Sequence, residues 1–133
     1  MQIKTIDLQN YSDARGGLVA LEESKEVPFT IRRIYFIYAT QPGVQRGFHA
    51  HKALTQLVVP VAGSCTFVLD DGAERTEVVL DNPARALLVE SMMWREMREF
   101  SADCVLMVLA SALYDEADYV RDYAQFLEGA KKP

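Results

Sequence analysis

The two histidines of the chain both lie in one short segment, residues 46–52, with the sequence RGFHAHK. If this segment is a strand, side chains two positions apart point to the same side, so His49 and His51 project together with Cβ atoms about 7 Å apart. Arg46 and Lys52 add positive charge to the same stretch. Imidazole groups bind metal ions or transfer protons near neutral pH, so the segment predicts a site of one of these two kinds.

The metal-site alternative is tested by a resemblance to the first cupin motif, G-x5-H-x-H-x4-E-x6-G. Two glycines and both histidines match it at the required spacing: Gly43, His49, His51 and Gly63. The glutamate position, however, holds Gln56, and the histidine that the second cupin motif supplies from a later strand is matched by Arg95. An arginine keeps its charge and repels a divalent cation, so we expect a site with no metal and no other cofactor.

Histidines that hold no metal are free for proton transfer beside a carbonyl group. In such a reaction a base removes a proton from carbon, an enediol forms, and the neighbouring carbon is reprotonated. The chemistry needs a base, a proton relay and a donor for the developing oxyanion. Histidine, tyrosine and arginine fill these roles, and all three occur around the motif.

Short β-rich runs must position these residues. They lie at residues 18–21, 30–39, 55–62, 64–69, 78–80, 86–89 and 105–110, with turn signals between them, including Asp70-Asp71-Gly72. Many short strands at this spacing predict an all-β sandwich or barrel, and the cupin motif specifies a jelly-roll barrel of antiparallel strands. One helical face formed by Tyr119, Tyr123, Phe126 and Leu127 predicts a short C-terminal helix. The length fits a single cupin domain over residues 1–133, whether it stands alone or belongs to a larger protein.

The composition excludes several classes of function. A net charge of −5 argues against broad nucleic-acid binding, which needs a basic surface. No apolar run is long enough to cross a membrane, and residues 1–7 lack the apolar core of a signal peptide. Cys65 and Cys104 lie in apolar runs and are expected to be core residues, so a reducing cytoplasm is the default location.

Several segments in order resemble one family over nearly the whole chain. They read DARGGLVALE, IRRIYFIY, RGFHAHK, GSC, LDDG, and VLAS followed by YDEADY. These are similar to segments of the sugar nucleotide 3,4-ketoisomerases, which act on dTDP-4-keto-6-deoxyglucose. The resemblance implies movement of the ketone from C4 to C3, toward 3-amino-3,6-dideoxy sugars and, with them, lipopolysaccharide. It also implies a homodimer whose subunits exchange N-terminal strands.

The same resemblance implies roles for the catalytic residues. His51 is expected to be the base at C3, and His49 to exchange a proton at the neighbouring position. A tyrosine of the strand at residues 34–38 is expected to join the relay. In a regular strand Tyr35 and Tyr38 point to opposite faces; family position favours Tyr38, and a shift of one residue favours Tyr35.

Substrate contacts are expected mainly from cations. Arg46 polarises the ketone or holds the diphosphate, and Lys52 is a further diphosphate contact. Strand alternation allows only one of Arg32 and Arg33 to line the pocket, and we choose Arg33. The predicted substrate-binding set is Arg33, Tyr35, Arg46, Lys52 and Arg95.

Arg95 is a departure from the family pattern, which reads W-H-E-M where this chain has WREM at residues 94–97. If the missing histidine only supports the site, activity survives with a changed pH dependence; if it carries a proton, the protein is slow, differently specific or inactive. Arg95 also has the alternative of pointing outward to pair with Glu96 or Glu99. Three other functions stay open: a dTDP-sugar epimerase, a non-catalytic sugar-nucleotide binding module and, least favoured, a metal-dependent dioxygenase.

Overall fold

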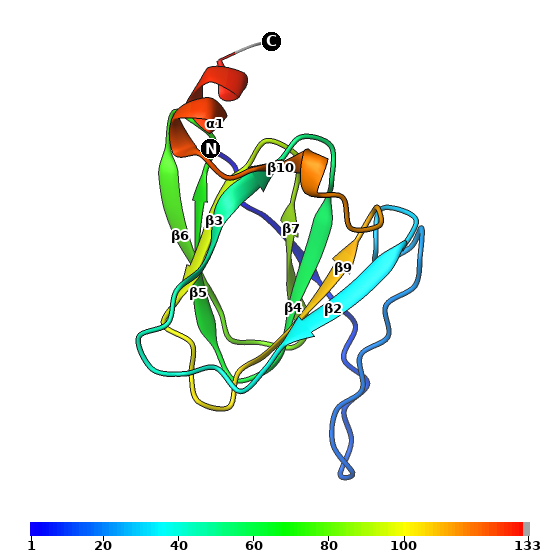
Figure 1. Ribbon diagram of the computed structural model, residues 1–133. Helices are drawn as coiled ribbons and strands as arrows, with labels where there is room; N and C mark the ends of the chain where they lie inside the picture. Colours follow the sequence, from blue (N-terminus) through cyan, green and yellow to red (C-terminus); the bar gives the residue numbers. More distant parts are fainter. Residues whose placement is uncertain (132–133) are drawn as a thin grey trace.

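Two antiparallel sheets face each other as a barrel in the computed structural model, which describes residues 1–131 (Figure 1). The first sheet has the strand order β1 (Lys4–Asp7), β7 (Arg85–Val89), β4 (Gln56–Ala62), β9 (Val105–Ala110) and β2 (Arg33–Ile37). The second has the order β10 (Tyr119–Val120), β3 (Arg46–His51), β8 (Trp94–Arg98), β5 (Cys65–Asp70) and β6 (Arg75–Leu80). A 3-10 turn, η1 (Glu116–Asp118), and a helix, α1 (Tyr123–Ala130), complete the chain. The predicted all-β jelly-roll barrel with a short C-terminal helix is confirmed.

Two apolar layers hold the barrel together. The larger fills the space between the sheets and includes Phe67, Leu87 and Leu106, each at most 2% exposed. Cys65 and Cys104 are free thiols in this layer, as predicted, and burial raises the pKa of Cys65 to about 12. The second layer lies where the segment at residues 8–31 packs on strands of the first sheet. Because that sheet is covered on both faces, β4 is buried along most of its length.

A hairpin near the N-terminus projects away from the barrel (Figure 1). Its two arms are joined by isolated bridges, Asn10 with Val19 and Asp13 with Gly16. The strand predicted at residues 18–21 is therefore present only as a bridge. Tyr11 and Leu18 are about 60% exposed on this hairpin, so it gains little from packing on its own barrel.

The C-terminal helix begins later in the chain than predicted. Tyr119 does not begin the helical face, because it belongs to β10 and pairs with His51 of β3. The helix begins at Tyr123, where the Asp122 side chain accepts hydrogen bonds from two backbone N–H groups of the first turn. Phe126 is fully buried and packs against Trp94, with ring centroids 5.7 Å apart. Neither helical element within residues 1–131 is long and apolar enough to span a membrane.

Candidate active site

A bulge in β3 shapes the segment that carries the histidines. Gly47 (φ +91°) and Phe48 (φ +58°) adopt left-handed backbone conformations, and the pairing of β3 with β8 shifts register between Gly47 and His49. A Cβ atom on Gly47 would lie 2.8 Å from the Arg95 carbonyl oxygen, so only glycine permits this approach. Beyond the bulge the rings of His49 and His51 meet edge to face, with centroids 4.9 Å apart. The prediction that the two side chains project together is confirmed.

A cavity of about 630 Å³ lies beside His49, bounded by β2, β3 and the C-terminal segment. Its polar lining comes from Arg33, Tyr35, Gln45, Arg46, His49, Tyr119 and Arg121. The placement of Arg33 and Arg46 agrees with the predicted pocket, and Arg32 is exposed outside it. Three arginines in one cavity of an acidic protein favour an anionic ligand.

A smaller cavity of about 310 Å³ lies beside His51. Ser111, Asp115 and Asp118 line it, and Arg33 and Tyr119 line both cavities. The Tyr119 ring centroid is 4.4 Å from that of His51 and 5.0 Å from that of His49. Arg33 and Tyr119 therefore mark the place where a ligand can reach both histidines.

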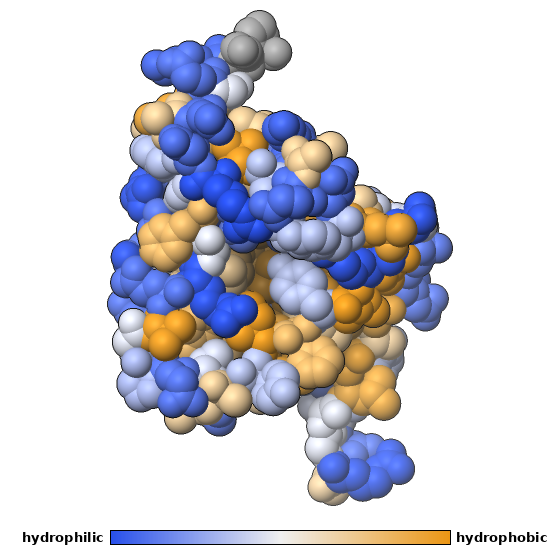
Figure 2. All heavy atoms as spheres, in the orientation of Figure 1, coloured by the Kyte–Doolittle hydropathy of each residue, from blue (hydrophilic) through white to orange (hydrophobic). Residues whose placement is uncertain are grey.

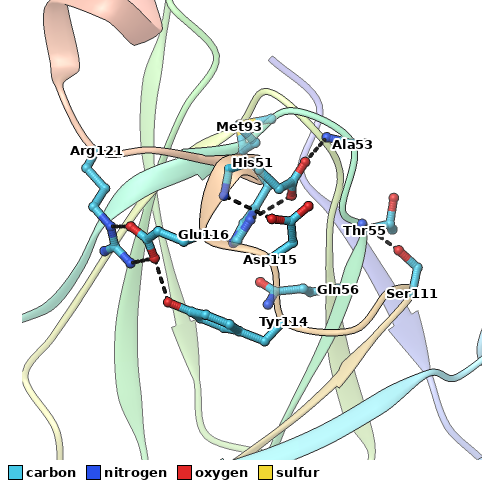
Figure 3. Close-up of polar contacts among 12 residues, drawn as sticks. His51, Ala53, Thr55, Gln56, Met93, Ser111, Tyr114, Asp115, Glu116 and Arg121 are labelled. Atoms are coloured by element: carbon cyan, nitrogen blue, oxygen red, sulfur yellow. Dashed lines mark hydrogen bonds and ion pairs between the residues drawn. The ribbon is translucent and has the colours of Figure 1, made fainter.

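The C-terminal segment supplies residues that the sequence analysis missed. Glu116 accepts hydrogen bonds from Arg121 at 2.7 and 2.9 Å and from the Tyr114 hydroxyl at 2.5 Å, as the dashed lines in Figure 3 show. The Arg121 guanidinium also lies 4.1 Å from the Tyr119 ring centroid. Tyr119 was assigned to a helical face, and no local pattern marks it or Arg121 as site residues.

Asp118 is another residue that the sequence analysis missed. Its Oδ2 lies 3.0 Å from His51 Nδ1, and its Oδ1 accepts the Ala53 backbone N–H at 2.9 Å. The two partners are 67 residues apart in the chain. The contact exists because β10, directly after Asp118, pairs with β3.

The structure corrects the choice between the two tyrosines. Tyr35 lines the larger cavity, and its hydroxyl accepts a hydrogen bond from Gln56 Nε2 at 3.2 Å. Burial raises the pKa of Tyr35 above its ordinary value. Tyr38 is 66% exposed, because strand alternation puts it on the same outward face as Phe36, whose ring centroid lies 5.8 Å from that of Tyr38. Tyr35, and not Tyr38, is the tyrosine of this strand that faces the barrel interior.

Lys52 also lies apart from the cavities. It follows the last residue of β3, its side chain is exposed, and it lines neither the larger nor the smaller cavity. Its backbone N–H donates to the Asp118 carbonyl oxygen at 2.9 Å. Lys52 therefore contributes to the fold through its backbone. Its side chain does not lie where the predicted contact with a diphosphate would require it.

Arg95 points into the barrel, so the outward alternative is wrong. It is 2% exposed, and its Nη1 and Nη2 donate to Gln56 Oε1 at 2.5 Å and to the Met93 carbonyl oxygen at 3.0 Å. Two of the four cupin ligand positions are thus occupied by the Arg95 cation and by the Gln56 amide that is hydrogen-bonded to it. Within residues 1–131, no three His, Cys, Asp or Glu side chains are grouped to hold a metal ion. These residues do not fit the metal that the cupin motif implies.

The buried guanidinium controls the charge of the histidines. Burial, followed by the charge of Arg95, lowers the pKa of His49 to about 4. The same two causes, in the same order, lower the pKa of His51, and Asp118 opposes them only in part. Burial lowers the pKa of Arg95 itself to about 10, which leaves it protonated at neutral pH. The site thus holds two neutral imidazoles beside a cationic cavity, an arrangement suited to proton abstraction next to a polarised carbonyl.

Comparisons with known proteins agree with this chemistry. A family model described as "FdtA: WxcM-like, C-terminal" matches residues 1–131. The TDP-4-oxo-6-deoxy-alpha-D-glucose-3,4-oxoisomerase of Aneurinibacillus thermoaerophilus is 51% identical over 126 residues, which cover 95% of this chain and 91% of that protein. A 3,4-ketoisomerase from Helicobacter canadensis has a similar structure, with a TM-score of 0.95, 45% identity and coverage of 99% of both chains.

Two further structures are similar, one a ketoisomerase and the other a more distant epimerase. A mutant of the 3,4-ketoisomerase QdtA from Thermoanaerobacterium thermosaccharolyticum, in complex with TDP-4-keto-6-deoxyglucose, is 35% identical with a TM-score of 0.95, and the match covers 97% of this chain and 94% of that one. NovW, a 4-keto-6-deoxy sugar epimerase from Streptomyces spheroides, is 19% identical with a TM-score of 0.74, covering 88% of this chain and 67% of that one. The likeness to the epimerase shows the fold alone.

Replacing Arg95 by methionine tests the electrostatic control of the histidines. Arg95→Met removes the cation at similar side-chain length, so the pKa of His49 is expected to rise from about 4 while staying below 6.5, because burial is the larger cause of its depression. NMR titration of the ring protons measures this, and the chain has only two histidines to assign. Arg98→Met is the matched control, since the Arg98 side chain pairs with Glu77 instead. Unchanged histidine pKa values in Arg95→Met would contradict the account.

Proposed function

The chain belongs to the family described as "FdtA: WxcM-like, C-terminal", and on this premise we propose that it is a sugar nucleotide 3,4-ketoisomerase. Its substrate is then dTDP-4-keto-6-deoxyglucose and its product a dTDP-3-keto-6-deoxyhexose. The observation that carries the proposal is the pair of neutral histidines beside an arginine-lined cavity. The 51% identity to an oxoisomerase supports the same reaction class, whereas the epimerase likeness is limited to the fold.

The proposed reaction moves two protons and changes no net oxidation state. His51 takes the proton from C3, and the electron pair of that C–H bond forms a C3=C4 double bond while the C4 ketone oxygen gains a proton. The resulting enediol loses the proton of its 3-hydroxyl as the C3 carbonyl forms. The electron pair of the C3=C4 bond takes a proton at C4, and we assign this delivery to His49, which takes the proton up from solvent while His51 releases the C3 proton to solvent. The relay tyrosine gives the C4 oxygen its proton and takes the proton of the 3-hydroxyl. Neutral imidazoles suit the first step, because a base must be unprotonated to accept the proton.

The cavities suggest where the substrate lies. His49 borders the larger cavity and His51 the smaller, so the sugar ring is best placed against Arg33 and Tyr119, which line both. Two charges of the diphosphate are complementary to Arg46 and Arg121 in the larger cavity. Tyr35 is the proposed relay residue, since its hydroxyl faces this space and is held by Gln56. The cytoplasmic location agrees with a reducing environment for the two buried free thiols and stays a prediction.

Incubation with dTDP-4-keto-6-deoxyglucose in deuterated buffer tests the reaction, with NMR of the product as the readout. We expect the carbonyl at C3, deuterium at C4, and product formation by the wild-type protein. His51→Asn is expected to reduce turnover by at least about 100-fold, the range typical of a lost general base, with an unchanged circular dichroism spectrum. A ketone left at C4 with an inverted centre would indicate an epimerase instead. Tight nucleotide binding with neither proton exchange nor product would indicate a binding module.

A matched pair of tyrosine variants tests the relay. Tyr35→Phe is expected to lower kcat by about 10- to 100-fold, because it removes a hydroxyl that faces the cavity. Tyr38→Phe removes the same atom from an exposed side chain and is expected to change kcat by less than about twofold. Steady-state kinetics of both variants gives the answer. A larger loss in Tyr38→Phe than in Tyr35→Phe would restore the original sequence-based choice.

We also propose that two copies of the chain pair through the N-terminal region. The projecting hairpin exposes Tyr11 and Leu18, and the edge strand β2 exposes Ile34 and Phe36, each between 55% and 62%. Figure 2 shows apolar atoms gathered on the side of the barrel where β2 lies, next to the base of the hairpin. An exposed edge strand beside a projecting hairpin is suited to strand exchange with a second copy.

Sedimentation equilibrium tests the pairing. We expect a mass of two 15.0 kDa chains for the wild-type protein. Phe36→Glu places a charge in the proposed interface and is expected to shift the protein toward a single chain. Val79→Glu is the control, because Val79 is 57% exposed on β6 of the other sheet. A wild-type protein that sediments as one chain would refute the proposal.

A further inference from the structure

We propose that Asp118 is a positioning residue that holds His51 in the tautomer with the proton on Nδ1 and a free lone pair on Nε2. This rests on the proposed isomerase function, in which His51 is the base. The hydrogen bond between the two side chains, 3.0 Å from Asp118 Oδ2 to His51 Nδ1, is the starting observation. His51 Nε2 is buried and has no hydrogen-bond partner within residues 1–131.

The Asp118 carboxylate is fixed in its orientation. Oδ1 accepts the Ala53 backbone N–H at 2.9 Å, which leaves Oδ2 toward the imidazole. The backbone of Asp118 is held on both sides, because its N–H donates to the Asp115 carbonyl oxygen at 3.0 Å and its carbonyl oxygen accepts from Lys52. An ionised carboxylate can only accept hydrogen bonds, so the Nδ1 of His51 must be the donor. The proton of neutral His51 therefore lies on Nδ1, and Nε2 is the basic atom.

The groups around His51 explain why this carboxylate matters for the reaction. His51 faces His49 on its own strand, Arg95 on β8, Tyr119 on β10 and Asp118 on η1. Arg95 and the protonated form of His49 both oppose a positive charge on His51. Asp118 is the anionic group in contact with the ring, so it stabilises the imidazolium that forms when His51 accepts the C3 proton. One carboxylate thus fixes the tautomer before the proton transfer and balances the charge after it.

Asp118→Asn changes the hydrogen bond made to the His51 ring while it keeps the volume of the side chain at position 118. The Ala53 N–H still requires an acceptor, so the amide oxygen is expected to take the Oδ1 position. The NH2 group then lies where Oδ2 was, and it donates to Nδ1 of His51. This places the ring proton on Nε2, which leaves no lone pair at the basic position.

Kinetics and NMR of two matched variants test the proposal. Asp118→Asn is expected to lower kcat by about 100-fold or more with little change in KM, the range seen when a carboxylate that orients a functional histidine is lost. Asp122→Asn removes the same charge four positions away, keeps a side chain that can cap α1, and lines neither cavity, so its kcat is expected to stay within about twofold. Nitrogen-15 NMR of the two histidines is expected to show Nδ1–H for His51 in the wild-type protein and in Asp122→Asn, and Nε2–H in Asp118→Asn.

The outcomes distinguish this inference from the proposed function. A wild-type tautomer in Asp118→Asn, or a changed tautomer with an unchanged kcat, would overturn the positioning role while isomerase activity of the wild-type protein upheld the function. If the wild-type protein formed no 3-keto product, the proposed function would fail. The tautomers of the variants would then still decide whether Asp118 orients His51, because that measurement needs no substrate.

Discussion

The buried guanidinium of Arg95 is the charge to which the rest of the site is adapted. A cation removed from water is costly unless its surroundings supply acceptors, and here Gln56 and the Met93 carbonyl oxygen do so. Because the positive charge of Arg95 acts on both histidines, it favours their neutral forms. Arginine and glutamine at two cupin ligand positions also leave a donor set that does not fit a metal. One residue in the barrel therefore keeps the histidine pair neutral, the state that the proposed proton transfer requires.

The position of β3 between β8 and β10 brings the functional groups together. Pairing with β8 places Arg95 opposite His49, and pairing with β10 places Tyr119 opposite His51. The bulge at Gly47 allows β3 to approach the β8 backbone closely. The C-terminal segment is thus part of the site as well as a cover for the barrel, because α1 anchors it through Phe126 and Trp94.

Local and overall charge have opposite signs in this protein. The chain carries a net charge of −5, yet its larger cavity is lined by Arg33, Arg46 and Arg121. Of these, Arg121 is paired with Glu116, which holds it over the Tyr119 ring. Such a local cluster of cations suits an anionic ligand even in an acidic protein, because nearby charges act more strongly than distant ones across solvent.

The sequence by itself determined the features that local patterns encode. Short β-rich runs predicted an all-β sandwich or barrel, and the cupin resemblance favoured the barrel. H-x-H spacing predicted the paired imidazoles, and strand alternation left a place in the pocket for only one of Arg32 and Arg33. Tertiary structure decided the rest: the packing of β2 on β9 turns Tyr35 inward and Tyr38 outward; Arg95 turns inward to meet Gln56; and Asp118 reaches His51 from 67 residues away. The reason is physical, because alternation fixes which residues share a face, whereas which face turns inward and which partner a buried polar atom finds depend on pairing between segments distant in the chain.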